Sequence, residues 1–394
     1  MKPREIPQAE ARYIVPTYSR PDVVFTHGEG VYLFDSEGNR YLDWVSGIAV
    51  TALGHSDPEW VQVVRDQAGK LTHVSNLYHT APHVELAQRL VESSFADRVY
   101  YCNSGAEANE AALKFVRKWA GVHFGASKKH IVAFEHCFHG RTYGALSLTY
   151  KAKYRMPFAP LLPDISFIPL NDIEAAQHAI GETTCAVFIE PLQGEGGIHP
   201  AEGVFLSELR SLCNTHEALL VFDEVQCGLG RTGYLWAHDA HGVNPDIMTL
   251  AKPLAGGLPI GATLVTEEIA RAIKVGDHGS TFAAGPLVCR AAQVVFDRIS
   301  QPEFLQGVRS KGEKIMRQLK EVDSAHILDV RGAGLLIGVE FDQPVKPLID
   351  AARGRGLLVV NAGENVLRIC PPLVINNEEL EEGLEILGDC IADL

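Results

Sequence analysis

The strongest constraint on the fold is a regular alternation of helix-type and strand-type segments that begins near Pro58. Amphipathic stretches such as PEWVQVVRDQAGKL and HVELAQRLVESS alternate with short apolar runs, namely RVYYC, HIVAF, CAVFIE, ALLVFD, DIMTLA and GATLVT. Strands that alternate with helices form parallel βαβ units. Strands of such sheets are buried on both faces and are therefore apolar throughout. The pattern predicts an α/β fold with a large, mostly parallel sheet.

The pattern of helix-type and strand-type segments changes after about residue 286. Two long amphipathic segments are followed by short strand-like runs (GLLIGVEF, GLLVV, NVLRIC) and by an acidic helix from about Asn377, which predicts a smaller α+β domain. The opening segment has hairpin-like runs around turn residues at Asp35 to Gly38 but no obvious core of its own. We therefore expect three units: residues 1–57, which pack beside the small domain or across a partner subunit, a large domain (58–286) and a small domain (287–394).

Composition and charge exclude several classes of protein. The chain has 49 acidic and 35 basic residues, a net charge of −14, and the basic residues are scattered, which disfavours nucleic-acid binding. The first residues contain no apolar stretch long enough for a signal peptide or a membrane span, so we expect a cytoplasmic protein without a membrane partner. The eight cysteines form no CxxC pair and no histidines cluster at ligand spacing, so we expect buried thiols and no metal site.

The segment NSGAEANEAALKF follows a strand-type run and predicts a helix that begins near Gly105. Ser104 stands three residues before Glu107, the spacing of a capping box. Small residues at Gly105 and Ala106 leave the first N–H groups open to a ligand, and a helix N-terminus favours phosphate. A plain, well-capped helix has the same features, so this segment alone does not establish a phosphate site.

The segment ALLVFDEVQCGLGRTG ends an apolar strand in Asp223 and Glu224. Acids at the carboxyl end of a strand in an open α/β sheet are candidates for a site, and a carboxylate there can keep a ring nitrogen protonated. An acidic strand end facing solvent is the alternative. Gly228, Gly230 and Gly233 match GxGxxG, but no long helix follows, and GxxxxGK[ST] is absent, which argues against dinucleotide and nucleoside triphosphate sites.

Lys252 ends another apolar run and precedes a loop rich in proline and glycine, DIMTLAKPLAGGLPIGATLVT. A lysine that is partly desolvated has a pKa below the free value of about 10.4 and becomes a nucleophile toward an aldehyde. Most lysines are solvated surface groups, so the position of Lys252 leaves both interpretations open. Its apolar flanks favour a functional role.

Together and in order, these segments resemble the class III, or ornithine-type, pyridoxal-phosphate aminotransferases, and most closely the N-acetylornithine aminotransferases. The matching blocks span almost the whole chain: GIAVTALGHSDP, SNLYHT, NSGAEANEAALK, CFHGRT, EPLQGEGG, VFDEVQCGLGRTG, AKPLAGGLPIGA, HGSTF and LRICPPLVI. The resemblance implies a fold-type I transferase with a mostly parallel seven-stranded sheet, and a homodimer with shared sites. It departs from the commonest pattern at Ala283, Ala284 and Gly285, where many relatives have GGN.

The resemblance assigns roles around pyridoxal 5'-phosphate. Lys252 is similar to the lysine that binds the cofactor covalently and moves the proton, and Asp223 to the carboxylate that pairs with the ring nitrogen. Phe138 matches the ring that stacks on the pyridine, and Thr281, beside Ser280, matches the hydroxyl that reaches the phosphate from the neighbouring subunit. The full implied set of cofactor-binding residues is Ser104, Gly105, Ala106, Phe138, Asp223, Glu224, Val225, Gln226, Lys252 and Thr281.

Substrate-binding roles follow from the same resemblance. Arg141 and Arg368 are similar to the two arginines that bind substrate carboxylates, and Glu190 to the glutamate that pairs with such an arginine while the amine donor is bound. We place Ser280 with this group. The expected reaction moves the terminal amino group of N-acetylornithine to 2-oxoglutarate. Succinylornithine, ornithine, 4-aminobutyrate or lysine-pathway donors remain alternatives, as do a mutase or decarboxylase of the same fold and a non-catalytic cofactor-binding protein.

Overall fold

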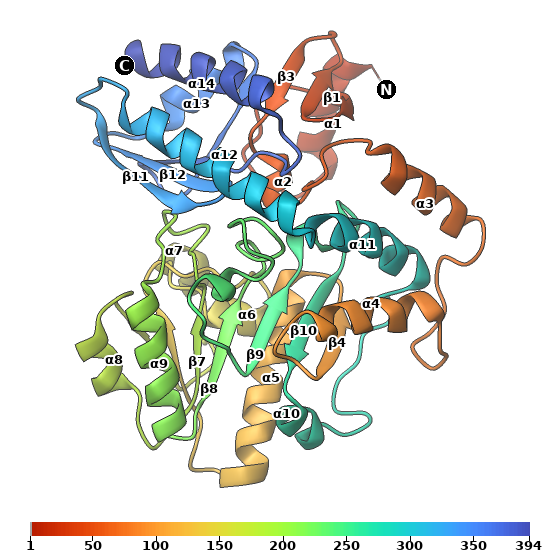
Figure 1. Cartoon of the computed structure of the whole chain (residues 1–394), viewed down its shortest axis with the longest axis vertical. Coiled ribbons are helices and arrows are strands. Elements are labelled where there is room, and N and C mark those ends of the chain that lie inside the picture. The colour runs from red at the N-terminus through yellow and green to blue at the C-terminus, as the bar shows by residue number, and fades with distance from the viewer. Residues whose placement is uncertain (1) are drawn as a thin grey trace.

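The computed structural model describes residues 2–394, and a seven-stranded sheet forms the centre of its larger part (Figure 1). The strand order is β4 (Arg98–Cys102), β10 (Gly261–Val265), β9 (Ile247–Leu250), β8 (Leu219–Asp223), β7 (Thr184–Ile189), β5 (His130–Phe134) and β6 (Ile165–Ile168). Strand β10 runs antiparallel to both of its neighbours, and the remaining pairs are parallel. The α/β class and the mostly parallel seven-stranded sheet predicted above are confirmed.

Helices cover both faces of this sheet because its strands are apolar on both sides. Val221 of β8 packs in the cluster built around the long helix α5 (Gly105–Phe124), whereas its neighbours Leu220 and Phe222 pack with α8 (Ile173–Ala179) and α9 (Gly203–Thr215). The other helices of this region are α3 (Pro58–Ala68), α4 (Ala81–Glu92), α6 (Tyr143–Ser147), α7 (Ala152–Arg155), α10 (Glu267–Ala272) and α11 (Pro286–Ile299). Alternate residues of one strand thus enter different helical layers.

The C-terminal region forms a second layer above the large sheet (Figure 1). Its sheet has the order β11 (Ile327–Ala333), β12 (Leu336–Phe341), β15 (Val366–Ile369) and β14 (Val360–Asn361). Its helices are α12 (Pro302–Lys320), α13 (Lys346–Gly354) and α14 (Asn377–Ala392). Asn376 caps α14, because its side chain accepts a hydrogen bond from the backbone N–H of Glu379. The strands and the acidic helix expected after residue 286 are therefore present.

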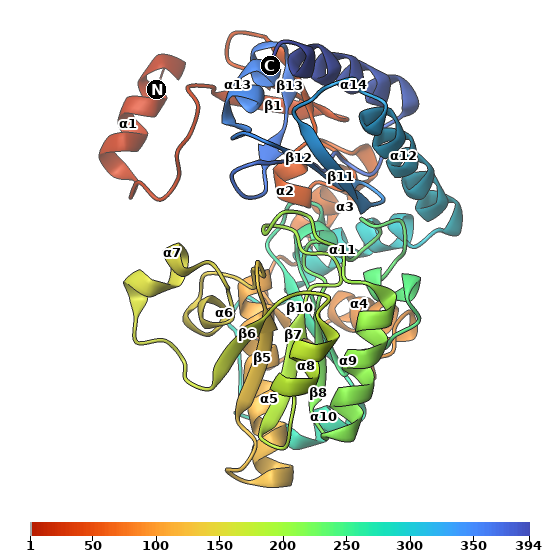
Figure 2. The same ribbon diagram turned by 90° about the vertical axis from the view of Figure 1, so that its left-hand side faces the viewer.

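The N-terminal region contributes strands to a third sheet. Strands β1 (Phe25–Glu29), β2 (Tyr32–Asp35) and β3 (Arg40–Asp43) are antiparallel neighbours, and β3 pairs in parallel with β13 (Leu357–Leu358). The expected turn lies between β2 and β3, where the Asp35 carboxylate accepts the N–H groups of Glu37 and Asn39. Before these strands, α1 (Ile6–Tyr13) stands away from the rest of the chain, as Figure 2 shows.

Short helical turns complete the chain. They are η1 (Pro3–Glu5), α2 (Ser46–Ala49), η2 (Met156–Phe158), η3 (Ala237–Ala240) and η4 (Lys252–Ala255). All eight cysteines are buried and free, as expected. None of the helices within residues 2–394 combines the length and the apolar character that crossing a lipid bilayer requires.

Candidate active site

A cavity of about 260 Å³ lies where the carboxyl ends of the central strands meet the start of α5. Ligands in open α/β sheets bind at this edge. Larger hollows occur elsewhere on the molecule, but this one collects a lysine, three carboxylates, an arginine and an aromatic ring. Its lining consists of Gly105, Ala106, Asn109, Phe138, His139, Gly140, Arg141, Glu190, Glu195, Asp223, Val225, Gln226 and Lys252.

Lys252 enters the cavity because strand β9 ends two residues before it and the backbone turns at Ala251 into η4. Burial lowers the pKa of the Lys252 amine from its ordinary value of 10.5, while the carboxylate of Glu195 opposes that change. A lower pKa makes the neutral, nucleophilic form of the amine easier to reach near pH 7. The structure therefore places Lys252 where the sequence predicted it, with the predicted direction of the shift.

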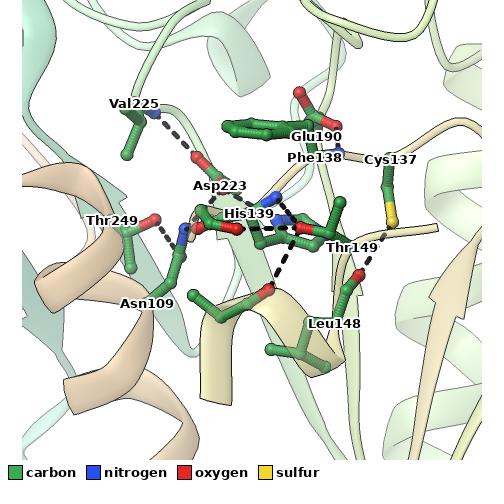
Figure 3. A network of polar contacts seen from close by, with 12 residues as sticks. Asn109, Cys137, Phe138, His139, Leu148, Thr149, Glu190, Asp223, Val225 and Thr249 are labelled. Carbon is green, nitrogen blue, oxygen red and sulfur yellow. Dashed lines mark hydrogen bonds and ion pairs between the residues drawn. The ribbon is translucent and has the colours of Figure 1, made fainter. Parts of the chain in front are cut away.

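Asp223, the last residue of β8, is held by three hydrogen bonds (Figure 3). Its Oδ2 accepts from Asn109 Nδ2 at 2.7 Å and from His139 Nδ1 at 2.8 Å, and its Oδ1 accepts from the Val225 N–H at 3.0 Å. Behind Asn109, the hydroxyl of Thr249 donates to the Asn109 Oδ1 at 2.9 Å. These three donors fix the orientation of the carboxylate.

Sequence reasoning missed Asn109, His139 and Thr249. All three are buried, at 1%, 2% and 0% exposure. Asn109 lies four residues after Gly105 on α5, so helix periodicity already places it on the face that meets the cavity. His139 stands within the CFHGRT block beside Phe138. No sequence spacing connects either residue to Asp223, because the strands meet only in the fold.

The start of α5 matches the prediction of a capped helix that begins at Gly105. The Ser104 hydroxyl accepts the Glu107 N–H at 3.2 Å, but the Glu107 carboxylate accepts the N–H of Asn103 instead of the N–H of Ser104, so only half of the expected box forms. A Cβ on Gly105 would lie 2.6 Å from a methyl carbon of Val225. Glycine at this position therefore lets α5 and the loop after β8 close around the cavity.

The carboxylate that pairs with Arg368 is Glu195, not the Glu190 that we expected. Arg368 Nη1 lies 2.5 Å from Glu195 Oε1 and 3.1 Å from Gln226 Oε1. Glu190 instead accepts backbone N–H groups, from Phe138 at 3.0 Å and from Gly194 at 3.1 Å. The two glutamates are five residues apart in EPLQGEGG, and the turn between them aims only the second at the arginine.

Arg368 and Arg141 differ in environment. Arg368 is 1% exposed, and its Nε has no hydrogen-bond partner among the described residues. Arg141 is exposed at the edge of the cavity, with its guanidinium 3.6 Å from the ring centroid of Tyr154. No carboxylate within residues 2–394 pairs with Arg141. Arg141 is therefore available to an anion, whereas Arg368 is available only if Glu195 moves.

Five predicted residues do not line the cavity: Ser104 and Arg368, described above, and Glu224, Ser280 and Thr281. The Glu224 carboxylate turns away and accepts from the N–H of Ala237 and from the N–H and ring of His238. Successive residues at a strand end point to opposite sides of the chain, so Glu224 points away from the side that Asp223 faces. Our expectation that Glu224 binds the cofactor does not fit this geometry. Ser280 bonds Asn103 through its hydroxyl, and Thr281 is exposed at the surface of the single chain.

The residues of the cavity fit a phosphorylated aromatic aldehyde. The amine of Lys252 suits a carbonyl carbon, Asp223 suits a protonated ring nitrogen, and Phe138 offers a ring to stack against. Gly105 and Ala106 expose the positive end of a 20-residue helix to a phosphate. The donor set is thus complete for such a group.

Comparisons with known proteins agree with this geometry. Residues 13–391 match the family model described as aminotransferase class-III. The chain is 53% identical to the mitochondrial acetylornithine aminotransferase of Alnus glutinosa, over 99% of this chain and 88% of that protein. It is 43% identical to the acetylornithine aminotransferase of Caldanaerobacter subterraneus, over 98% of each chain.

Solved structures show the same likeness. The N-acetylornithine aminotransferase of Stenotrophomonas maltophilia superposes with a TM-score of 0.84 at 38% identity, over 98% of each chain. An ornithine aminotransferase of Toxoplasma gondii, described with partial occupancy of PLP at its active site, superposes with a TM-score of 0.96 at 29% identity, over 100% of this chain and 94% of that one. This chain belongs to the class III aminotransferases.

Proposed function

We propose that this chain is a PLP-dependent aminotransferase that moves the terminal amino group of N-acetyl-L-ornithine to 2-oxoglutarate. The products are N-acetyl-L-glutamate 5-semialdehyde and L-glutamate, a step of arginine biosynthesis, formed in two half-reactions. The names of relatives that match nearly the full chain support N-acetylornithine as the amine donor. The single observation that carries the proposal is that two arginines at the site differ in state. Arg141 forms no ion pair among the described residues, whereas Arg368 is neutralised by Glu195, which a substrate carboxylate can displace.

Bound PLP supplies an electron-withdrawing ring that stabilises negative charge at the carbon next to the transferred nitrogen. The amine of Lys252 holds the cofactor and then takes and returns the proton at that carbon. The Asp223 carboxylate, oriented by its own hydrogen bonds, would hold a proton on the ring nitrogen. Phe138 would pack against the ring, and the first N–H groups of α5 would hold the phosphate.

The two arginines explain how one site accepts two substrates. Arg141 is exposed and unpaired among the described residues, so it suits a carboxylate that both amine donor and amino acceptor carry. Arg368 suits the second carboxylate of 2-oxoglutarate, which displaces Glu195. N-acetylornithine has no second carboxylate, and during its half-reaction Glu195 stays paired with Arg368 so that no buried charge is left uncompensated.

The active protein is a homodimer in this proposal, and Thr281 reaches the cofactor phosphate of the partner subunit. Thr281 and Phe282 are exposed in the single chain, and the loop that contains Leu77 and Tyr78 lies beside them. Asn76 bonds the carbonyls of Ser280 and Ala283 across these two loops. Leu77, Tyr78 and Phe282 are 86%, 68% and 70% exposed, and exposed apolar residues that gather in this way mark a protein interface.

We also propose a cytoplasmic location. The relative from Alnus glutinosa is named a mitochondrial protein, whereas the name of the bacterial relative carries no such designation. Fractionation of cells that produce the protein, with an antibody against it, distinguishes the two compartments.

A substrate panel tests the function. Initial rates are measured with purified protein, PLP and 2-oxoglutarate for N-acetylornithine, N-succinylornithine, ornithine and 4-aminobutyrate. The proposal predicts the highest kcat/KM for N-acetylornithine and no turnover without 2-oxoglutarate. A higher kcat/KM for another donor assigns the enzyme to that substrate, and repeated turnover without an amino acceptor identifies a mutase or decarboxylase.

A further inference from the structure

Glu190 is a buried carboxylate that forms no ion pair within residues 2–394. It follows the last residue of β7, its side chain is 5% exposed, and each of its oxygens is used by a different segment. Oε2 accepts the N–H of Phe138 at 3.0 Å, and Oε1 accepts the N–H of Gly194 at 3.1 Å. One rigid side chain therefore connects two loops of the cavity.

Each of these two loops carries one group that the proposed mechanism uses. Phe138 provides the ring that faces the cofactor, and Gly194 precedes Glu195, the carboxylate that pairs with Arg368 at 2.5 Å. Arg368 Nη1 also lies 3.5 Å from the Gly194 carbonyl oxygen. If a substrate carboxylate displaces Glu195, the displacement therefore acts on Gly194, whose N–H is bound to Glu190.

Close packing leaves the loop after Glu190 little room to shift against its neighbours. A Cβ on Gly196 would collide with the carbonyl oxygen of His136, and a Cβ on Gly194 would collide with the side chain of Gln226. A second hydrogen bond, from Gln193 Nε2 to the Glu135 carbonyl at 2.8 Å, joins the same loops outside the cavity. Packed elements of this kind shift between discrete arrangements and do not deform continuously.

We propose that Glu190 is a positioning residue that couples the state of the Glu195–Arg368 pair to the placement of the Phe138 ring against the cofactor. The inference rests on the proposed function, because it takes the two arginines as carboxylate sites. When a dicarboxylate opens the Glu195–Arg368 pair, Gly194 moves, Glu190 follows its N–H, and the backbone of Phe138 follows Glu190. The ring is then placed differently for the amine donor and for the dicarboxylate.

The charge of Glu190 suits this role. Burial is the main cause that raises the pKa of Glu190 to about 7, with His139 opposing the change and Asp223 adding to it. Glu190 forms no ion pair among the described residues, and its two backbone donors stabilise its charge directly. Losing either donor is therefore unfavourable, which keeps both loops attached while they move.

Glutarate, a dicarboxylate that cannot be transaminated, provides the test. The wild-type holoenzyme is titrated with glutarate while visible circular dichroism reports the cofactor and calorimetry reports binding. The wild type is expected to bind glutarate and to change its cofactor signal. Glu190→Gln keeps the shape but replaces one acceptor oxygen by NH₂, and it is expected to bind glutarate within about threefold of wild type while losing most of the signal change.

Gln193→Ala is the matched control, because it removes the other hydrogen bond between the loops. It is expected to keep the signal change. The coupling is overturned if the Glu190→Gln protein retains the full signal change. It is also overturned if the effects of Glu190→Gln and Glu195→Gln on the signal are additive in the double variant. Because glutarate is not turned over, this result is independent of which amine donor the enzyme prefers.

Hydrogen exchange on the wild type decides the question if the variants do not retain PLP. The peptides that contain Phe138 and Gly194 are expected to change protection together when glutarate is added. A change at Gly194 without a change at Phe138 overturns the proposal.

Discussion

The guanidinium of Arg368 lies 2.5 Å from the Glu195 carboxylate, and the two partners differ sharply in exposure, with side chains 1% and 30% accessible. The arginine is fixed in the core of the site, and the glutamate is the partner that can leave. Burial opposes the ionisation of Glu195, but Arg368 and Lys252 lower its pKa below the ordinary value. The pair is therefore a charged switch at neutral pH.

Glu195→Gln is expected to reduce the discrimination between amine donors. Without the carboxylate, Arg368 is open to glutamate during both half-reactions. The ratio of kcat/KM for N-acetylornithine to that for glutamate should fall by about tenfold or more, which corresponds to roughly 1.4 kcal/mol. Steady-state rates with both donors measure it. Gln193→Ala is the comparison, since the Gln193 side chain bonds the Glu135 carbonyl and not Arg368, and an unchanged ratio in Glu195→Gln would show that the pair does not govern donor choice.

Asn109→Ala is expected to weaken both the fold and the cofactor site. The substitution removes a donor to Asp223 and leaves the buried hydroxyl of Thr249 without its acceptor. Losses of buried hydrogen bonds of this kind cost about 1–3 kcal/mol. Urea unfolding measures the stability, and fluorescence quenching by PLP measures affinity. Thr249→Val breaks only the outer hydrogen bond and should cost less. Equal effects in both variants would argue against a direct role of Asn109 on Asp223.

Complementation tests the shared site. Lys252→Ala and Thr281→Asp proteins, each inactive alone, are mixed under conditions that exchange subunits. If Thr281 serves the partner's site, each mixed dimer has one intact site, and random exchange should restore about a quarter of wild-type activity. If Thr281 serves its own chain, the mixture stays inactive. The measurement is specific activity before and after exchange, with size-exclusion chromatography to confirm the dimers.

Glu190 predicts a pH-dependent stability difference. Its pKa is raised in the folded protein from 4.5 to about 7, so the folded state binds this proton more tightly than the unfolded state does. The resulting stabilisation is fully present below pH 4.5 and is lost as the pH rises through about 7. Glu190→Gln lacks this loss, so the free energy of unfolding of the variant minus that of wild type should rise by roughly 3 kcal/mol between pH 4.5 and pH 8.

Urea unfolding of both proteins at several pH values measures this difference. Glu313→Gln serves as the control, because Glu313 is exposed and forms no ion pair among the described residues. Its difference from wild type should stay flat with pH. A flat difference for Glu190→Gln as well would mean that the carboxylate is not desolvated as the structure describes.

Sequence periodicity predicted the large sheet because its strands are apolar on both faces, and it predicted the start of α5 because Ser104 caps the helix. Asp223 ends an apolar strand and Lys252 follows one by two residues, which made both of them candidates, and the resemblance to the family assigned their roles. The division into residues 1–57, 58–286 and 287–394 stays a prediction. The pairing of β3 with β13 joins the first of these to the last, a contact between distant segments that no local pattern contains.

The sequence-based prediction was wrong where the geometry inside a loop determines which side chain meets which partner. EPLQGEGG offers two glutamates, and only the turn at Gly194 determines that Glu195 meets Arg368. The segment Ser46–Ala49 also could not be predicted from the sequence, because all four residues have positive φ. A β-branched residue such as Ile48 rarely adopts that conformation. The Ser46 hydroxyl bonds the Cys370 carbonyl at 2.6 Å, two residues beyond Arg368. Tertiary contacts therefore determine this turn.

The most direct test of the account is to locate the lysine that holds PLP. The holoenzyme is reduced with borohydride, digested and analysed by mass spectrometry, alongside Lys252→Ala and Lys252→Arg treated in the same way. The account predicts a pyridoxyl label on the peptide that contains Lys252, no label in either variant, and a loss of transamination in both. A label on another lysine, or a Lys252→Ala protein that transaminates N-acetylornithine at the wild-type rate, would contradict it.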